Sequence, residues 1–202
     1  MLARLILWFG LSLFLVGCGA PSVWAPDDAV RAAAYRDPAA PSLTLITVIN
    51  NRSGDGAHSA LLVNASQRVL FDPAGSWYHS RAPERNDVFY GMTPRMVEIY
   101  TDYHARETHH VVMQTLLVSP ETAQEVLRRV ETYGAVSQAL CARSVSSILR
   151  GLPGLEGLGG TPLPLRLMRK FDRLPNVQTT KIFDDDPADH SAKLAPVVMR
   201  GQ

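Results

Sequence analysis

Residues 137–149 have the sequence SQALCARSVSSIL, which is typical of the start of a buried helix with Cys141 near its N-terminus. A thiol at that position lies close to the positive end of the helix dipole, which favours the thiolate. The neighbouring backbone N–H groups are placed to stabilise an oxyanion. With a histidine far upstream on a predicted strand, this is the arrangement that a cysteine nucleophile needs.

The chain of 202 residues contains only two cysteines, and the second one belongs to the N-terminal segment. Arg4 is followed by an apolar run over residues 5–16, which has the length of a secretory signal and is too short to span a bilayer. Residues 15–19, LVGCG, resemble the bacterial lipobox. In that motif the cysteine, here Cys18, is acylated and becomes the first residue of the mature protein.

The predicted lipobox sets the expected location of the protein. Acyl chains on Cys18 would anchor it stably to a membrane. Gly19 is not the aspartate that resembles an inner-membrane retention signal, so we expect the periplasmic face of the outer membrane. The alternatives are an uncleaved anchor helix and an ordinary signal peptide. With Cys18 acylated, Cys141 has no disulfide partner. We therefore expect Cys141 to be either a buried core residue or a functional thiol.

Composition limits the class of protein. The formal net charge of +1 comes with scattered lysines and arginines, which argues against a nucleic-acid partner. Hydrophobic residues make up 46% of the chain, enough for the core of one domain. We expect a signal peptide at 1–17, a membrane tether at 18–41, one domain at 42–175 and a flexible tail at 176–202.

Hydrophobic spacing predicts a mixture of strands and helices. Strands are expected at 42–49, 57–63, 68–72 and 109–118, with a short extended piece within 87–90. Helices are expected at 28–35, 94–104, 120–133 and 141–149, with a last helix starting at Thr161 and Pro162.

His58 is the best candidate for a base that activates Cys141. If the turn between the second and third strands is centred on Ala65, His58 faces Asp72 directly across the hairpin, and such residues project from the same face. Asp72 would then orient the imidazole, on the face toward the Cys141 helix. A slip of one residue would move Asp72 to the other face. The orienting group would then be sought among His79, Asn86 and the glutamines.

Three short motifs resemble those of one family. Residues 56–63 have the sequence GAHSALLV, residues 69–75 have VLFDPAG, and Tyr133 lies eight residues before CARSV at 141–145. In this order they resemble the circularly permuted branch of the NlpC/P60 papain-like superfamily, which includes lecithin–retinol acyltransferase-like proteins and several bacterial lipoproteins. The resemblance implies an α+β papain-like domain whose small antiparallel sheet packs against the nucleophile helix.

The resemblance also implies the roles of the site residues. Cys141 would be the nucleophile, His58 the base and Asp72 the orienting third residue. Tyr133 would pack near the site. Leu140 departs from the family pattern, because many relatives have asparagine immediately before the cysteine.

The resemblance implies acyl transfer through a thioester, with no cofactor. Cys141 would attack an amide or ester carbonyl while His58 transfers the proton. Peptidoglycan peptides are the nearest expected substrate, and lipid acyl groups are the alternative. A competing interpretation is a non-catalytic envelope lipoprotein that serves as a binding or scaffolding module.

A second group of polar residues has types that suit zinc. It contains His104, His109 and His110, with Glu107 and Asp102. Adjacent residues on a strand point to opposite faces, so His109 and His110 cannot easily bind one ion. We therefore expect a solvated connector and no metal site.

Overall fold

The computed structural model describes residue 20 and residues 22–189. The predicted signal peptide, Cys18 and the last part of the predicted tail lie outside the described residues. Within the described part, no helix combines the length and the apolar character needed to cross a membrane.

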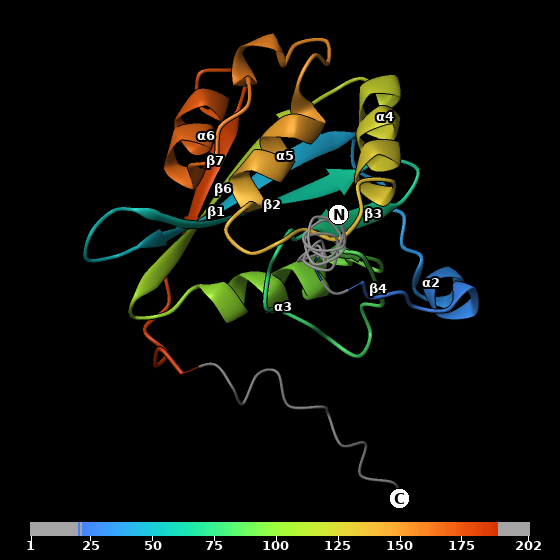
Figure 1. The fold of residues 1–202 in the computed structure, drawn as a ribbon, viewed down its shortest axis with the longest axis horizontal. Coiled ribbons are helices and arrows are strands. Elements are labelled where there is room, and N and C mark those ends of the chain that lie inside the picture. The colour runs from blue at the N-terminus through green and yellow to red at the C-terminus, as the bar shows by residue number, and fades with distance from the viewer. Residues whose placement is uncertain (1–19, 21, 190–202) are drawn as a thin grey trace, which may run out of the picture.

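An antiparallel sheet of seven strands forms the centre of the fold (Figure 1), which confirms the predicted α+β class. The strands are β1 (Ser42–Asn50), β2 (Gly56–Asn64), β3 (Arg68–Phe71), β4 (Glu84–Arg85), β5 (Val88–Phe89), β6 (His109–Leu117) and β7 (Gln178–Ile182). Their order in the sheet is β4-β5-β3-β2-β1-β6-β7, and every neighbouring pair is antiparallel.

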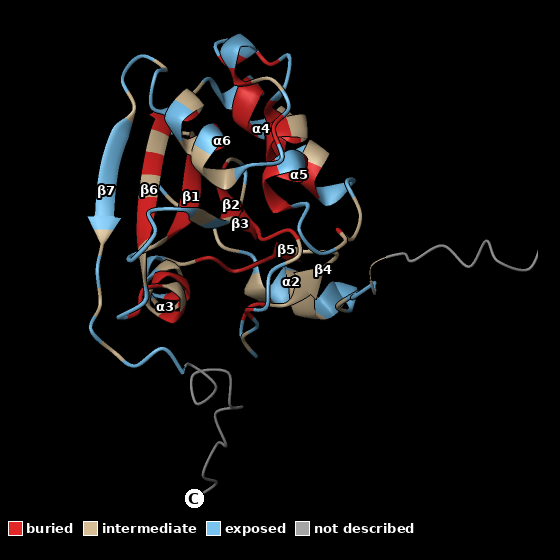
Figure 2. Cartoon of the chain, turned by 60° about the vertical axis from the view of Figure 1, so that its left-hand side comes forward, coloured by how far each residue is buried: buried red, intermediate tan, exposed pale blue. Residues whose placement is uncertain are grey.

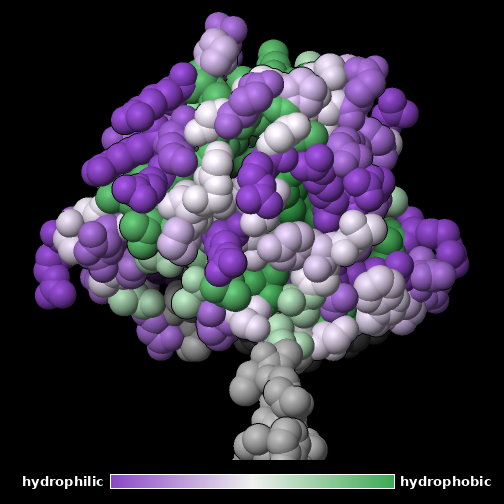
Figure 3. Space-filling model, turned by 45° about the horizontal axis from the view of Figure 1, so that its top comes forward, coloured by the Kyte–Doolittle hydropathy of each residue, from purple (hydrophilic) through white to green (hydrophobic). Residues whose placement is uncertain are grey.

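Helices cover both faces of this sheet. They are α2 (Asp27–Ala33), α3 (Pro94–His104), α4 (Pro120–Glu131), α5 (Cys141–Leu149) and α6 (Pro164–Phe171), with a short 3-10 turn at Glu156–Leu158. In Figure 1, α4, α5 and α6 lie on one face and α3 lies on the other. The face that carries α4 to α6 is mainly hydrophilic on its outside, as Figure 3 shows.

The central strands are apolar because both of their faces are covered. In β2, Leu61 and Val63 belong to the core under α4 to α6, while Ala60 and Leu62 belong to the core over α3. Successive side chains of a strand point to opposite faces, so a strand between two cores is apolar at nearly every position. The edge strand β7 is mostly exposed, as Figure 2 shows.

Two helices begin at the predicted capping residues. The Thr93 side chain accepts a hydrogen bond from Met96 at the start of α3, and the Ser119 side chain accepts one from Thr122 at the start of α4. In both helices proline occupies the first position, where its missing N–H costs nothing.

The last helix begins later than predicted. The predicted start was Thr161, but α6 begins at Pro164. The reason lies in α5: the Ser146 hydroxyl accepts a hydrogen bond from the Thr161 N–H at 3.1 Å and bonds to the Thr161 carbonyl at 3.3 Å. These two bonds hold the Thr161 backbone against α5, outside a helix.

Two segments expected to be loosely held belong to the fold. Residues 178–182 of the predicted flexible tail form β7, which pairs with β6. Residues 22–41 of the predicted tether contain α2 and contact the domain. The Arg68 N–H donates to the Tyr35 carbonyl at 2.7 Å, and the Asn64 amide donates to the Ala39 carbonyl at 3.3 Å. The described part of the predicted tether, residues 22–41, therefore packs on the domain and contains a helix close to the expected one.

Candidate active site

The hairpin that carries His58 has a register two residues away from the predicted one. Leu61 lies opposite Phe71, so extending the pairing would place Asp72 opposite Ala60 and not opposite His58. A displacement of two residues keeps a side chain on the same face. The two side chains therefore still meet, with 2.6 Å between His58 Nε2 and Asp72 Oδ1.

The face on which the two residues meet also differs from the expectation. Asp72 Oδ1 accepts a second hydrogen bond from the Tyr100 hydroxyl of α3 at 2.7 Å. The His58 ring stacks on the His104 ring of α3, with 5.9 Å between the centroids and 6° between the planes. Cys141 belongs to the core on the opposite face. The prediction that His58 and Asp72 project toward the Cys141 helix is therefore wrong.

The thiol reaches His58 at the point where β3 ends. β2 continues past its last pair with β3, so its backbone near Ser59 is open toward the first turn of α5. There the backbone N–H groups of Ser59 and Ala142 and the His58 ring lie near the Cys141 sulfur and favour its thiolate. Groups from the two faces of the sheet thus come together beyond the end of a short strand.

Each of the three groups shifts the protonation of its neighbours. Burial raises the pKa of the Cys141 thiol, but hydrogen bonding and positive charge from His58 outweigh it and leave the pKa below its usual value. Burial lowers the pKa of His58, but the charge and hydrogen bond of Asp72, together with Cys141, raise it to about 10. Burial raises the pKa of Asp72, yet His58 holds it below its usual value. The shifts of Cys141 and His58 both act in the direction of a thiolate beside an imidazolium.

The turn after β3 is built around the Asp72 carboxylate. A Cβ placed on Gly75 would lie 1.9 Å from Asp72 Oδ2, so only glycine fits there. The Gly75 N–H donates to the Asp72 carbonyl at 3.1 Å, and Ala74 has a φ of 57°. Asp72 itself is 1% exposed. The sequence DPAG therefore fixes the carboxylate under the imidazole.

Asp87 connects the two halves of the site. Its backbone carbonyl accepts from the Asp72 N–H at 2.8 Å, and its carboxylate accepts from the Val136 N–H at 2.7 Å and from Ala74. Val136 lies in the segment that leads into α5. Asp87 has a φ of 68°, a left-handed conformation that aspartate adopts more readily than most residues.

Sequence reasoning missed Tyr100, His104 and Asp87 as parts of the site. Tyr100 and His104 are four residues apart, so they share one face of the predicted helix. That spacing shows only that the two side chains are neighbours, because the face of the sheet that a helix covers is not encoded locally. The turn-forming pair Asn86 and Asp87 predicts a tight turn but not the contacts of its carboxylate.

A cavity of about 490 Å³ opens beside His58. His58 lines it with Ala74, Gly75 and Gln138, and Ala188 of the C-terminal segment closes another side. This volume is in the range of small-ligand pockets. The His58 side chain is 15% exposed and Cys141 is 7% exposed, so a ligand in the cavity meets the imidazole first.

The predicted histidine cluster divides: His104 and His109 both line the cavity beside His58, whereas His110 lies elsewhere. His104 belongs to the site described above. Its Nδ1 lies 3.0 Å from the Tyr100 carbonyl. His109 lies 2.9 Å from the Thr108 hydroxyl, and the His110 ring stacks on Phe183.

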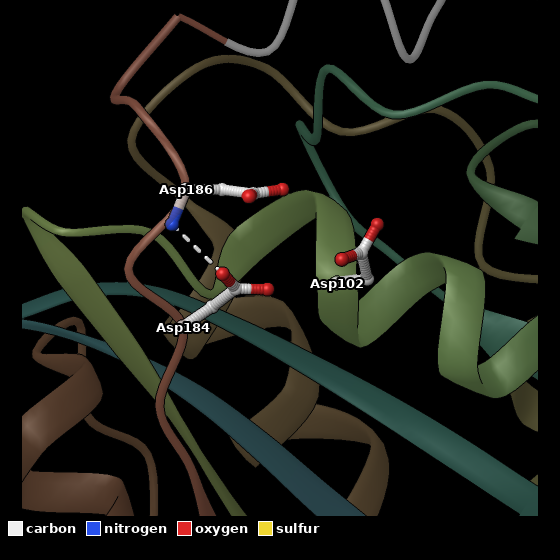
Figure 4. A group of neighbouring side chains, drawn as sticks. All are labelled: Asp102, Asp184 and Asp186. Atoms are coloured by element: carbon white, nitrogen blue, oxygen red, sulfur yellow. Dashed lines mark hydrogen bonds between the residues drawn. The ribbon is translucent and has the colours of Figure 1, made fainter.

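Asp102, which was grouped with those histidines, lies beside two other aspartates (Figure 4). Carboxylate oxygens of Asp102, Asp184 and Asp186 are within 4.8 Å of one another. The Arg106 Nη1 atom is 3.9 Å from Asp102, 3.9 Å from Asp184 and 3.4 Å from Asp186. A buried guanidinium therefore supplies positive charge to this group and connects α3 to the chain beyond β7.

No family model, curated protein or solved structure matches this chain. Tyr133, expected near the site, packs edge-on against Phe71, with 5.6 Å between the ring centroids.

Proposed function

We propose that the protein is a membrane-anchored envelope lipoprotein with a cysteine hydrolase or acyltransferase site, in a permuted papain-like domain held by acylated Cys18. The observation that carries this proposal is the interaction of the Cys141 sulfur with His58, whose Nε2 lies 2.6 Å from Asp72. With Nε2 bonded to Asp72, Nδ1 is the ring nitrogen left for the thiol. His58 thus stands between the nucleophile and the orienting group, as covalent catalysis requires.

The reaction follows from this protonation state. The Cys141 thiolate attacks the carbonyl carbon of an amide or ester, and a C–S bond forms. The bond to the leaving group breaks, and the amine or alcohol departs with the proton that His58 carried. Water or an acceptor alcohol or amine then attacks the thioester and gives its proton to His58. The C–S bond breaks and the thiolate returns.

The first turn of α5 supplies donors for the oxyanion. Its N-cap residue, Leu140, makes no side-chain capping bond. The first N–H groups of a helix have no partners inside the helix. Without a cap they remain available to a negatively charged oxygen next to the sulfur.

The predicted location favours cell-wall peptides as the substrate, with lipid esters as the alternative. The cavity beside His58 supports either class, because Ser76 and Thr108 add hydroxyl groups to apolar walls formed by Val48 and Ala57. A peptide or ester needs this combination of a few polar contacts and apolar surface.

A second candidate function is a binding module without catalysis. The observation that favours it is that Cys141 is 7% exposed and belongs to the apolar core. A buried cysteine of this kind is often an inert packing residue.

Alkylation by iodoacetamide separates the two functions. For an enzyme, the rate should rise with pH through a midpoint clearly below the value of about 8.5 for a free cysteine. His58→Ala should move that midpoint upward, because it removes the positive charge beside the sulfur. Cys141→Ser is the control and should abolish labelling. Labelling that occurs only on unfolding, or a midpoint unchanged by His58→Ala, would refute the catalytic pair and favour the binding module.

A further inference from the structure

The segment that follows the predicted acylation site is attached to the edge of the sheet. Trp24 forms a bridge with Arg85 of β4, and the Ala25 N–H donates to the Glu84 carbonyl at 2.9 Å. The Asn86 N–H donates to the Val23 carbonyl at 2.9 Å. These bonds extend the sheet by one short piece beyond β4.

The contact that lies nearest to Cys18 in sequence is made by Ser22. The Ser22 hydroxyl lies 2.8 Å from the Asn86 side-chain oxygen. Four residues of extended chain reach at most about 14 Å, so Ser22 cannot lie farther than this from Cys18. The headgroup layer on one side of a bilayer is about 5–8 Å thick. An acylated Cys18 would therefore bring this edge of the domain to the membrane surface.

The side chains exposed at this edge suit that surface. Val23 is 45% exposed and Trp24 is 61% exposed. The Arg85 guanidinium lies over the Trp24 ring, 4.7 Å from its centroid, and pairs with the Asp27 carboxylate and the Ala25 carbonyl, so it holds the Trp24 ring at this edge. Tryptophan has an apolar body and a polar N–H, and it settles at the headgroup level of membranes.

We infer that the edge carrying the exposed Val23 and Trp24 side chains docks on the lipid headgroup layer and fixes the orientation of the domain. This inference rests on the proposed acylation of Cys18. The docked segment, β4, β5, β3 and β2 are successive neighbours in the sheet. Four steps of about 4.8 Å across the sheet separate this edge from β2, the strand that carries His58, by about 19 Å. The candidate site would therefore act on bonds in the layer that adjoins the membrane.

Quenching by brominated phospholipids tests this docking in vesicles that carry the acylated protein. The chain has three tryptophans: Trp8 in the predicted signal peptide, Trp24, and Trp77, which is 4% exposed. Trp77→Phe leaves Trp24 as the probe of the mature chain, and Trp24→Phe leaves Trp77 as the matched control. Because an interfacial tryptophan lies next to the lipid chains, Trp24 should lose about half of its emission and Trp77 very little.

A linker variant checks that docking depends on the short connection. A flexible insertion of about 20 Gly and Ser residues between Gly19 and Ala20 lowers the effective concentration of the edge at the membrane. Quenching of Trp24 should then fall while the protein still sediments with vesicles. Sedimentation of the original protein with no quenching of Trp24 would overturn the docking and leave the anchor intact. Failure to sediment would overturn the anchor, and the docking with it.

Discussion

The two faces of the sheet hold their parts of the site by different means. On the α3 face, the Asp72 carboxylate binds both His58 and Tyr100, so polar contacts between particular atoms fix the base. On the other face, Cys141 is placed by the apolar packing of α5 and by backbone N–H groups. Polar contacts fail when one atom is replaced, whereas packing tolerates replacements of similar volume. The α3 face should therefore be the more sensitive half of the site.

The largest effect is expected for Asp72→Ala. It leaves a buried imidazole and the Tyr100 hydroxyl without their acceptor, and breaking a buried charge pair costs about 3–5 kcal/mol. Chemical unfolding should show this loss, and alkylation of Cys141 should become slower at neutral pH. Asp72→Asn is the matched control, because it keeps the shape and one acceptor and should lose less. Equal stability of wild type and Asp72→Ala would contradict the central role of the carboxylate.

The pH dependence of this stability difference follows from the two pKa shifts. Asp72 has a folded pKa below 3.8, so its contribution is present above that value and is lost as the pH falls through the folded pKa. His58 has a folded pKa of about 10, so its contribution is complete below 6.5 and is lost as the pH rises toward about 10. The stability difference between wild type and Asp72→Ala should therefore be largest between pH 4 and 6.5. A difference that grows from pH 7 to 10 would contradict the shift of His58.

The sequence predicts the parts of this site better than their arrangement. The hairpin strands, the helix at Cys141 and the pairing of His58 with Asp72 all follow from local patterns. The predicted register is two residues off because the turn is centred beyond Ala65. The pattern of apolar residues does not distinguish registers that differ by two residues, since both put the same side chains on the same face. The face was wrong because both faces of β2 are covered, so the alternation of polar and apolar residues that marks an exposed face is missing.

A slightly smaller effect is expected for Gly75→Ala, which tests whether the missing side chain at Gly75 is what leaves room for the Asp72 carboxylate beside His58. The new Cβ would lie 1.9 Å from Asp72 Oδ2 and 2.5 Å from its Cγ, so the carboxylate must move away from His58. Overpacking of this kind costs about 1–3 kcal/mol. Gly157→Ala is the matched control, since nothing lies within 4 Å of its added Cβ. The midpoint of Cys141 alkylation should rise for Gly75→Ala only, and an equal response of both variants would contradict the close contact.

An effect of similar size is expected for Tyr100→Phe, which removes one of the two bonds to Asp72 Oδ1 and keeps the ring packing. A hydrogen bond to a charged group contributes about 1.5–3 kcal/mol. Tyr103→Phe is the matched control: the Tyr103 hydroxyl lies 3.0 Å from the Ser76 hydroxyl, a neutral bond that contributes about 1 kcal/mol. Only Tyr100→Phe should weaken the hold on the carboxylate and shift the NMR titration of the His58 ring. If both variants lose equal stability and neither shifts the titration, the α3 face holds His58 by packing alone, and the contrast between the two faces disappears.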